Sequence, residues 1–168
     1  AEQVDGVIAY SSDPAAPTAA YVAEQLGLPT NPLRSVEVMS KKDLFRAHLQ
    51  AAGLPCPQAA AFSVDDDCAY VEGLTQGFRF PRVIKPTDSS GSKGVTVLRD
   101  YGQVDAAIRH ARNNSRNGVL IVEEYIEYGF PRVIGGDIFV VDGQVRFWGL
   151  MSCLRDESAP LVPVGEMM

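Results

Sequence analysis

The alternation of apolar and polar positions predicts one strand and one helix at the start of the chain. An apolar run at 6–10 predicts a short buried strand, and apolar residues then recur at helical spacing as far as Leu26. Asp13, followed by a proline, is placed to be the N-cap of that helix, and Gly27 is placed to end it. Because one strand–helix unit cannot bury a sheet face alone, we expect this segment to belong to a larger domain.

The next region combines a connection, a helix and a strand. Segment 31–34 contains a proline after an asparagine and predicts a connection. Ser40 with Asp43 has the spacing of a capping box, so a helix is predicted to begin at Ser40 and to end before Gly53. A strand is then predicted at 57–62.

The spacing of apolar residues shortens in the second half of the chain, which predicts a mixed α/β region. The predicted elements are a helix at 63–74 capped by Ser63 and Asp66, a strand at 82–85, a polar loop at 87–94, a strand at 95–98, a helix at 103–111 and a strand at 119–122. Asp142-Gly143 lies between apolar runs at 137–141 and 144–148, a pattern typical of a type I′ hairpin. The stretch from Cys153 onward has no clear period.

Composition narrows the class of protein. Hydrophobic residues make up 46% of the 168 residues and charged residues 21%, which is typical of a globular chain. The apolar runs are far shorter than the roughly 20 residues that span a bilayer, and no signal peptide is recognisable, so we expect no membrane partner. A net charge of −6 without basic clusters argues against a nucleic-acid partner.

The cysteines and histidines exclude several kinds of site. The three cysteines lie far apart, which favours reduced thiols and a cytoplasmic protein over disulfides or a zinc site. The two histidines, His48 and His110, both lie within predicted helices. We therefore expect neither Ser-His-Asp catalysis nor a histidine-based metal site.

The most informative stretch is a strand ending in Lys85 and followed by a loop of small residues. The loop consists of Asp88, Ser89, Ser90, Gly91, Ser92, Lys93 and Gly94. Small residues let backbone N–H groups approach an anion, and Lys85 and Lys93 would add positive charge for phosphate oxygens. An ordinary hairpin loop with two solvated lysines is the alternative. Neither a Walker A loop nor a Gly-x-Gly-x-x-Gly fingerprint matches, since Gly94 leads directly into a strand.

Two further features have functional and structural interpretations. The apolar run at 120–122 leads into Glu123-Glu124, and this could form a purine slot or simply a core strand with a solvated acidic end. Lys42 lies in the first turn of a predicted helix, where the helix dipole disfavours a cation. Surface lysines are common, so Lys42 alone indicates little.

Taken in order, these segments resemble the ATP-grasp superfamily, and in particular its carbamoyl-phosphate-synthetase-like and biotin-carboxylase-like ligases. The resemblance covers roughly residues 38 to 150. Its motifs are, in order, the segments 40–46 and 52–57, Val83-Ile84-Lys85-Pro86 with the loop at 89–95, and Val122-Glu123-Glu124-Tyr125-Ile126.

The resemblance implies a role in ATP binding for each segment. Lys42 would reach the nucleotide phosphates, Lys85 would contact the α- and β-phosphates, and the loop from Asp88 to Gly94 would close over the triphosphate. Glu123 and Glu124 would lie beside the adenine amino group or the ribose, while main-chain groups of Tyr125 and Ile126 would contact the ring. The usual reaction is attack of a carboxylate on the γ-phosphate, followed by displacement of the acyl phosphate by an amine or another nucleophile.

The resemblance also implies Mg²⁺, held in the family by two acidic residues and an asparagine well after the hinge. No asparagine follows Asn117, and Glu157 and Glu166 lie in the tail without a period, so we expect the Mg²⁺ ligands outside this chain. The ribose-contacting acid stays open between Glu127 and Asp137.

We therefore expect an α/β chain carrying an incomplete ATP-grasp fold with an α+β lid. Residues 1–39 would end a Rossmann-like domain, residues 40–125 would form the linker helix and lid, and residues 126–168 would begin the large ATP-binding sheet. The expected function is ATP binding within a carboxylate ligase whose carboxylate is unidentified, with this piece inactive alone. The alternative is a non-catalytic nucleotide-binding or assembly module. An open sheet edge also predicts a homodimer.

Overall fold

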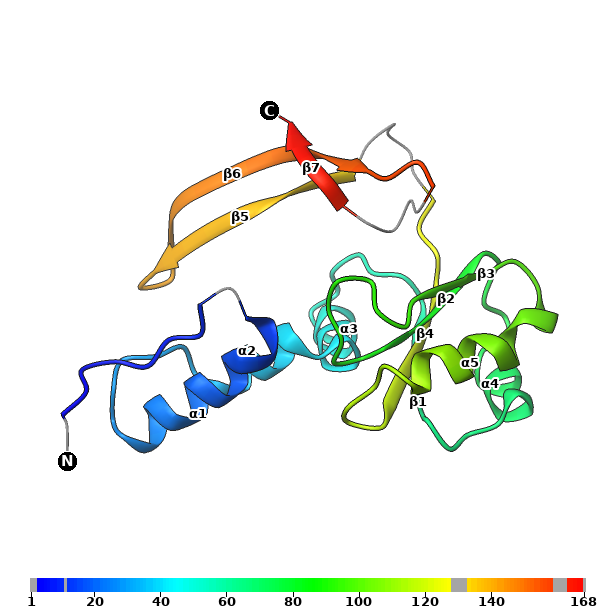
Figure 1. Cartoon of the computed structure of the whole chain (residues 1–168), viewed down its shortest axis with the longest axis horizontal. Coiled ribbons are helices and arrows are strands. Elements are labelled where there is room, and N and C mark those ends of the chain that lie inside the picture. Colours follow the sequence, from blue (N-terminus) through cyan, green and yellow to red (C-terminus); the bar gives the residue numbers. More distant parts are fainter. Residues whose placement is uncertain (1–2, 11, 128–132, 159–162, 168) are drawn as a thin grey trace. The chain divides into compact units, whose positions relative to one another are not determined.

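The computed structural model describes residues 3–10, 12–127, 133–158 and 163–167, which form two compact units. The first unit comprises Ala1–Tyr125 and the second Ile126–Met168. Each unit has a sheet of its own (Figure 1). The three-part functional division predicted from the sequence stays a prediction, because compactness alone does not define functional domains.

A four-stranded antiparallel sheet forms the centre of the first unit. Its order is β1 (Ala59–Ser63), β4 (Val119–Glu124), β2 (Arg82–Pro86) and β3 (Thr96–Leu98). The mixed α/β class predicted from the sequence is confirmed. Because β4 and β2 are the two central strands, their polar side chains lie in the middle of a sheet face rather than at a sheet edge.

The two faces of this sheet differ in what covers them. Side chains of α4 (Cys68–Leu74) and α5 (Val104–Arg112) form one hydrophobic core with the sheet, and η2 (Tyr101–Gln103) leads into α5. Ile84, Leu120 and Val122 are each at most 1% exposed within that core. Side chains alternate along a strand, so Lys85 and Glu123 lie on the opposite face. The hydrophobic core therefore directs the two charged groups away from α4 and α5.

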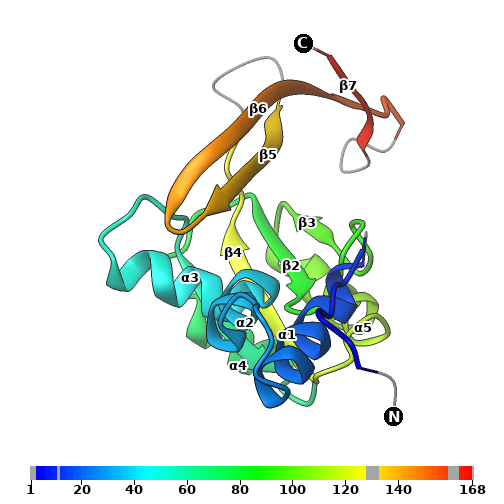
Figure 2. The same ribbon diagram turned by 90° about the vertical axis from the view of Figure 1, so that its left-hand side faces the viewer.

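The N-terminal segment is helical. It contains η1 (Asp13–Ala15), α1 (Ala16–Gln25) and α2 (Leu33–Ser40), and α1 packs against α2 (Figure 2). Gly27 ends the α1 region with a φ of +66°, as predicted. Among the described residues, no helix is long and apolar enough to cross a membrane.

Two expectations for this segment are wrong. Residues 6–10 form no strand, and Ile8 and Tyr10 are 84% and 86% exposed. A strand needs a neighbour for its backbone hydrogen bonds, and no described strand pairs with this run. Asp13 begins the short 3₁₀ turn instead of capping α1, whose N-cap is Ala15.

The predicted connection at 31–34 and the capping box at Ser40 are also wrong. Leu33 begins α2, and the Ser40 hydroxyl donates to the backbone oxygen of Val36 at 2.6 Å, which places Ser40 at the end of that helix. Such back-bonding uses the hydroxyl within its own helix and removes it as a cap for the next one. The next helix, α3 (Lys42–Ala51), has Lys41 as its N-cap, and Gly53 follows its end.

The predicted cap of α4 is shifted along the chain. Asp67 is the N-cap, because its carboxylate accepts from the Tyr70 N–H at 2.8 Å. Ser63 and Asp66 instead close the preceding turn, in which the Ser63 N–H donates to the Asp66 carboxylate at 2.7 Å. The turn before α4 uses the side chain of Asp66, so it is not free to cap the helix. The sequence pattern therefore predicted the helix correctly but placed its N-terminus too early.

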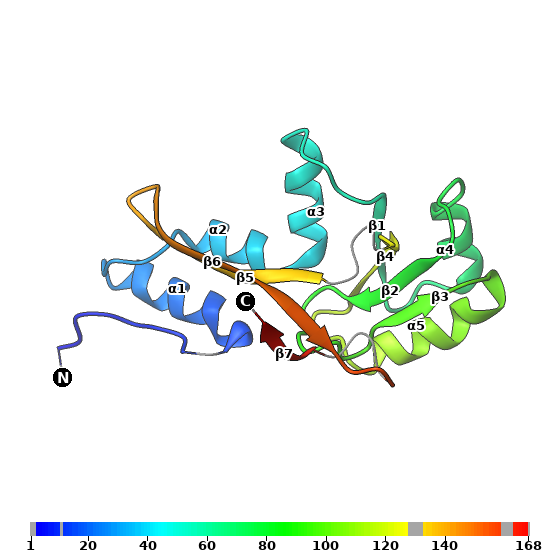
Figure 3. The same cartoon turned by 90° about the horizontal axis from the view of Figure 1, so that it is seen from above.

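The second unit is a three-stranded antiparallel sheet of β5 (Val133–Val141), β6 (Gln144–Arg155) and β7 (Pro163–Met167) (Figure 3). The predicted hairpin is confirmed, with φ angles of +51° at Asp142 and +71° at Gly143. The aperiodic tail was misjudged, since β6 continues to Arg155 and β7 pairs with it. β5 and β7 are the edges of this described sheet, the kind of edge on which the homodimer prediction rests.

Candidate functional site

Lys42 is the first residue of α3 and joins that helix to the loop after β2. Its backbone N–H donates to the carbonyl oxygen of Thr87 at 3.1 Å. Its ammonium group donates to the Ser89 carbonyl at 2.6 Å and approaches the Thr87 carbonyl at 3.4 Å. Residues 45 and 47 positions away along the chain therefore hold this side chain at the start of the predicted phosphate loop.

Lys85 belongs to an ion-pair network centred on Glu123, on the sheet face opposite the α4–α5 core. Its ammonium group is 2.8 Å from Glu123 Oε2. Arg46, one helical turn after Lys42 on α3, places its Nε 3.0 Å from Glu123 Oε1, although the two atoms are not aligned as a hydrogen bond. Glu123 is only 2% exposed, so one buried carboxylate fixes the directions of two cations.

The electrostatic surroundings of Lys42 disfavour its positive charge. Burial lowers the pKa of Lys42, and the nearby charge of Lys85 lowers it further, while Asp88 and Glu123 act in the opposite direction. Four cations (Lys42, Lys85, Arg46 and Arg116) surround two carboxylates (Asp88 and Glu123) in this group, so positive charge is in excess among these six side chains. A ligand carrying several negative charges would relieve this excess.

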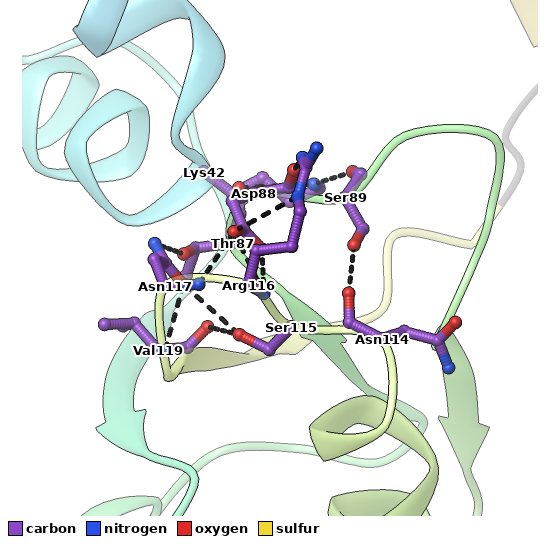
Figure 4. Close-up of polar contacts among 9 residues, drawn as sticks. All are labelled: Lys42, Thr87, Asp88, Ser89, Asn114, Ser115, Arg116, Asn117 and Val119. Carbon is purple, nitrogen blue, oxygen red and sulfur yellow. Dashed lines mark hydrogen bonds and ion pairs between the residues drawn. The ribbon is translucent and has the colours of Figure 1, made fainter. Parts of the chain in front are cut away.

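The base of the loop is fixed by the turn between α5 and β4, as Figure 4 shows. The Asp88 carboxylate accepts from the backbone N–H groups of Arg116 at 3.1 Å and Asn117 at 2.9 Å. The Asn117 side-chain amide donates to the Thr87 hydroxyl at 2.9 Å, and the Ser89 hydroxyl donates to the Asn114 carbonyl.

The remainder of the loop has the backbone conformation that small residues allow. Gly91, Ser92 and Gly94 have φ angles of +64°, +59° and +72°. Ser90, Gly91 and Lys93 are exposed, whereas Gly94 is buried against the Asn114 and Pro86 side chains. A Cβ at Gly94 would lie 2.8 Å from Asn114 Cβ, so this position requires glycine for both its conformation and its packing.

The predicted hinge begins at the end of β4. Glu124 accepts from the Arg79 backbone N–H at 2.7 Å, and the Tyr125 N–H donates to the Pro81 carbonyl at 2.9 Å. The Tyr125 N–H is therefore used within the first unit, where it ties the end of β4 to Pro81. Ile126 is the first residue of the second unit.

The first unit thus brings together Lys42, Lys85 and the base of the 88–94 loop, and it places Glu123 beside Lys85. The sequence reading missed the residues that hold them, namely Arg46, Thr87, Arg116 and Asn117. For Arg46 a signal existed, since it follows Lys42 by one helical turn. For the turn at 114–117 the polar composition suggested only a loop.

Among residues 3–10, 12–127, 133–158 and 163–167, no group of three or more His, Cys, Asp or Glu side chains is placed to hold a metal ion. The two candidates for the ribose-contacting acid, Glu127 and Asp137, both belong to the second unit. Their role, like the location of the Mg²⁺ ligands, stays a prediction.

Comparison with known proteins defines the class. Residues 41–135, more than half of the chain, match the family model described as carbamoyl-phosphate synthase L chain, ATP binding domain. The formate-dependent phosphoribosylglycinamide formyltransferase of Bordetella avium is 34% identical over 111 residues, which cover 64% of this chain and 27% of that protein. The cyanophycin synthetase of Trichormus variabilis is 33% identical over 113 residues, covering 66% and 11%. The chain thus spans about a quarter or less of these relatives' lengths.

Solved structures show the same fold at lower identity. An L-amino acid ligase from Bacillus licheniformis aligns with a TM-score of 0.71 and 24% identity over 93% of this chain and 34% of that one. The biotin carboxylase domain of the Hydrogenobacter thermophilus 2-oxoglutarate carboxylase, solved with MgADP, aligns with a TM-score of 0.69 and 19% identity over 88% and 33%. These neighbours define the fold as part of an ATP-grasp fold.

The protein is therefore of the ATP-grasp class, and within it the chain belongs to the family of carbamoyl-phosphate synthase L chain ATP-binding domains. The resemblance inferred from the sequence is confirmed. The individual nucleotide contacts of Lys42, Lys85, the 88–94 loop, Glu123, Glu124, Tyr125 and Ile126 stay predictions.

The buried carboxylate of Glu123 leads to a prediction about stability. Glu123→Gln removes the charge that compensates Lys85 and Arg46, so we expect the free energy of unfolding to fall by about 3–5 kcal/mol. Glu124→Gln is the matched control, because its cationic neighbour Arg79 is 87% exposed and such pairs contribute about 1 kcal/mol or less. Urea unfolding of both variants measures the difference. Equal losses would contradict the assignment of Glu123 as the central charge.

Proposed function

We propose that this chain binds the phosphates of ATP with Lys42, Lys85 and the loop from Asp88 to Gly94. One observation carries the proposal: the Lys42 ammonium donates to the Ser89 carbonyl at 2.6 Å at the base of the loop of small residues, and Lys85, from a strand far away in the sequence, is near enough for its charge to lower the pKa of Lys42. Preorganised cations and backbone N–H groups are the groups that stabilise transferring phosphates. The family to which the chain belongs supports the same ligand.

For the whole protein we propose an ATP-dependent carboxylate ligase. The named relatives include a formyltransferase and a synthetase, and the solved neighbours include an L-amino acid ligase. The chemistry would be transfer of the γ-phosphoryl group to a carboxylate, followed by attack of an amine or another nucleophile. Mg²⁺ would neutralise phosphate charge when bound. The cations of the first unit would hold the triphosphate in one orientation.

The adenine is proposed to lie at the end of β4. Glu124 lies at that end, where its carboxylate accepts from the Arg79 backbone N–H, and the Tyr125 N–H is bonded to the Pro81 carbonyl oxygen. Glu123 would act mainly through Lys85, since its buried carboxylate already compensates two cations. The contact expected of Glu123 with the adenine amino group or the ribose stays a prediction beside this role.

The proposal predicts unequal roles for the two lysines of the strand and the loop. Lys85→Ala should weaken ATP binding more than Lys93→Ala, because Glu123 holds Lys85 in position whereas Lys93 is exposed and must be ordered on binding. We expect about tenfold weakening for Lys85→Ala, equivalent to about 1.4 kcal/mol, and about threefold for Lys93→Ala. Calorimetric titration with ATP measures both. A reversed order would contradict the placement of Lys85.

The lowered pKa of Lys42 predicts uptake of a proton on ATP binding. A triphosphate favours the charged ammonium and raises its pKa, so a neutral Lys42 gains a proton on binding. Affinity should be constant below the lowered pKa and fall as pH rises through it. In titrations at increasing pH, all well above the phosphate pKa of about 6, the heats should depend more strongly on the buffer's ionisation enthalpy as the pH approaches the lowered pKa of Lys42.

Lys42→Met is the control for this measurement, since it removes the titrating group while retaining a side chain of similar length. The variant should lose the buffer-dependent heat. Identical heats in two buffers for the unmodified chain would show that Lys42 does not change protonation on binding.

A further inference from the structure

The turn at Asn114–Asn117, between α5 and β4, makes more contacts to the phosphate loop than a simple connection requires. Its residues bond three consecutive loop residues, Thr87, Asp88 and Ser89 (Figure 4). It also packs against Gly94, the last residue of the same loop. Both ends of the loop are therefore fixed by one short segment that lies outside every motif of the family resemblance.

The contacts at Asp88 orient the loop backbone. Its carboxylate accepts from two successive backbone N–H groups, those of Arg116 and Asn117, at 3.1 and 2.9 Å. The Arg116 guanidinium in turn donates to the Asp88 carbonyl oxygen and lies 3.6 Å from the carboxylate. Asp88 is thus held through both its main chain and its side chain, and the backbone on either side of it takes one orientation.

Asn117 connects the turn to the loop in a second way. Its side-chain oxygen accepts from the Val119 N–H at 3.0 Å and from the Ser115 hydroxyl at 3.2 Å, which closes the turn. Its side-chain nitrogen donates to the hydroxyl of Thr87, a residue that is 0% exposed. A single amide therefore ties the internal geometry of the turn to the first residue of the loop.

These contacts reach the nucleotide site through Lys42. The carbonyl oxygens of Thr87 and Ser89 both face its ammonium group, and this requires the intervening backbone to turn at Asp88. The turn at 114–117 holds that backbone through the Asp88 carboxylate, which accepts from the Arg116 and Asn117 N–H groups. Releasing it would let the two carbonyls rotate, and Lys42 would lose the partners that direct it before the nucleotide arrives.

We propose that Asn114–Asn117 is the positioning element of the phosphate-binding loop, and that Asn117 and Asp88 are positioning residues acting through Thr87 and Ser89 on Lys42. This proposal rests on the proposed ATP-binding function. Neither Asn117 nor the turn needs to touch the nucleotide. Their effect is confined to ligands with phosphates, because the loop and Lys42 face that part of the ligand.

Calorimetric titration of the full chain with adenosine, ADP and ATP tests this effect. Asn117→Ala removes the donor of the hydrogen bond between the Asn117 amide and the Thr87 hydroxyl, and the near-isosteric Thr87→Val removes its acceptor. Both should weaken ATP and ADP binding by about fivefold to tenfold and leave adenosine binding within about twofold, since one hydrogen bond is lost at the phosphate end. Thr87→Ser retains the hydroxyl and should restore most of the affinity for ATP.

Two controls separate positioning from a general loss of stability. Asp67→Ala removes the N-cap hydrogen bond of α4, away from the loop, and should leave all three affinities unchanged. In a Lys42→Met background, Asn117→Ala should weaken ATP binding by less than about twofold, because coupled residues are not additive. Equal weakening of adenosine and ATP, or an undiminished effect without Lys42, would overturn the proposal.

Hydrogen exchange of the ligand-free chain gives a readout that does not depend on nucleotide. Amides of residues 89–94 should exchange faster in Asn117→Ala and at the unmodified rate in Asp67→Ala. If Lys42→Met weakens ATP binding but Asn117→Ala changes neither affinity nor exchange, the positioning proposal is wrong while the proposed ATP-binding function stands. If the unmodified chain binds no ATP while Asn117→Ala accelerates exchange, the proposed function fails and the turn holds the loop for another purpose.

Discussion

The buried carboxylate of Glu123 is the interaction on which the arrangement of the first unit depends. It lies on β4, between Lys85 of β2 and Arg46 of α3, and thereby links two strands and a helix through one charge. Burying a carboxylate is costly unless cations compensate it, and here two do. Because α3 is held in this way, Lys42 at its first turn lies beside the loop that follows β2.

The same charges explain why the site suits a polyanion. Glu123 compensates only part of the positive charge that Lys42, Lys85 and Arg46 bring together, and the pKa of Lys42 is lowered mainly by burial and then by Lys85. A ligand with several negative charges would favour the Lys42 ammonium, whose pKa burial and Lys85 lower. Binding and preorganisation are therefore two consequences of one charge distribution.

The sequence allowed the sheet strands, the lysine-bearing strand and the glycine–serine loop to be predicted because their signals are local: apolar runs, small residues and a hairpin dipeptide. It failed where polar side chains had two local choices. Ser40 bonds back to Val36 and ends a helix instead of beginning one, and the run at 6–10 has no described strand to pair with. The holding contacts of Arg46 and Asn117 join distant segments, so no spacing rule could indicate them.

The central claim is that the first unit holds a nucleotide triphosphate between α3, β2 and the loop that follows β2. Amide chemical shifts of the isotopically labelled chain, recorded during titration with ATP, test this most directly. The account predicts that saturable shift changes are largest at residues 87–94, with further changes near Lys42 and at 123–125. Changes concentrated elsewhere, for instance on α1 and α2, or an absence of saturable change at the loop, would contradict it.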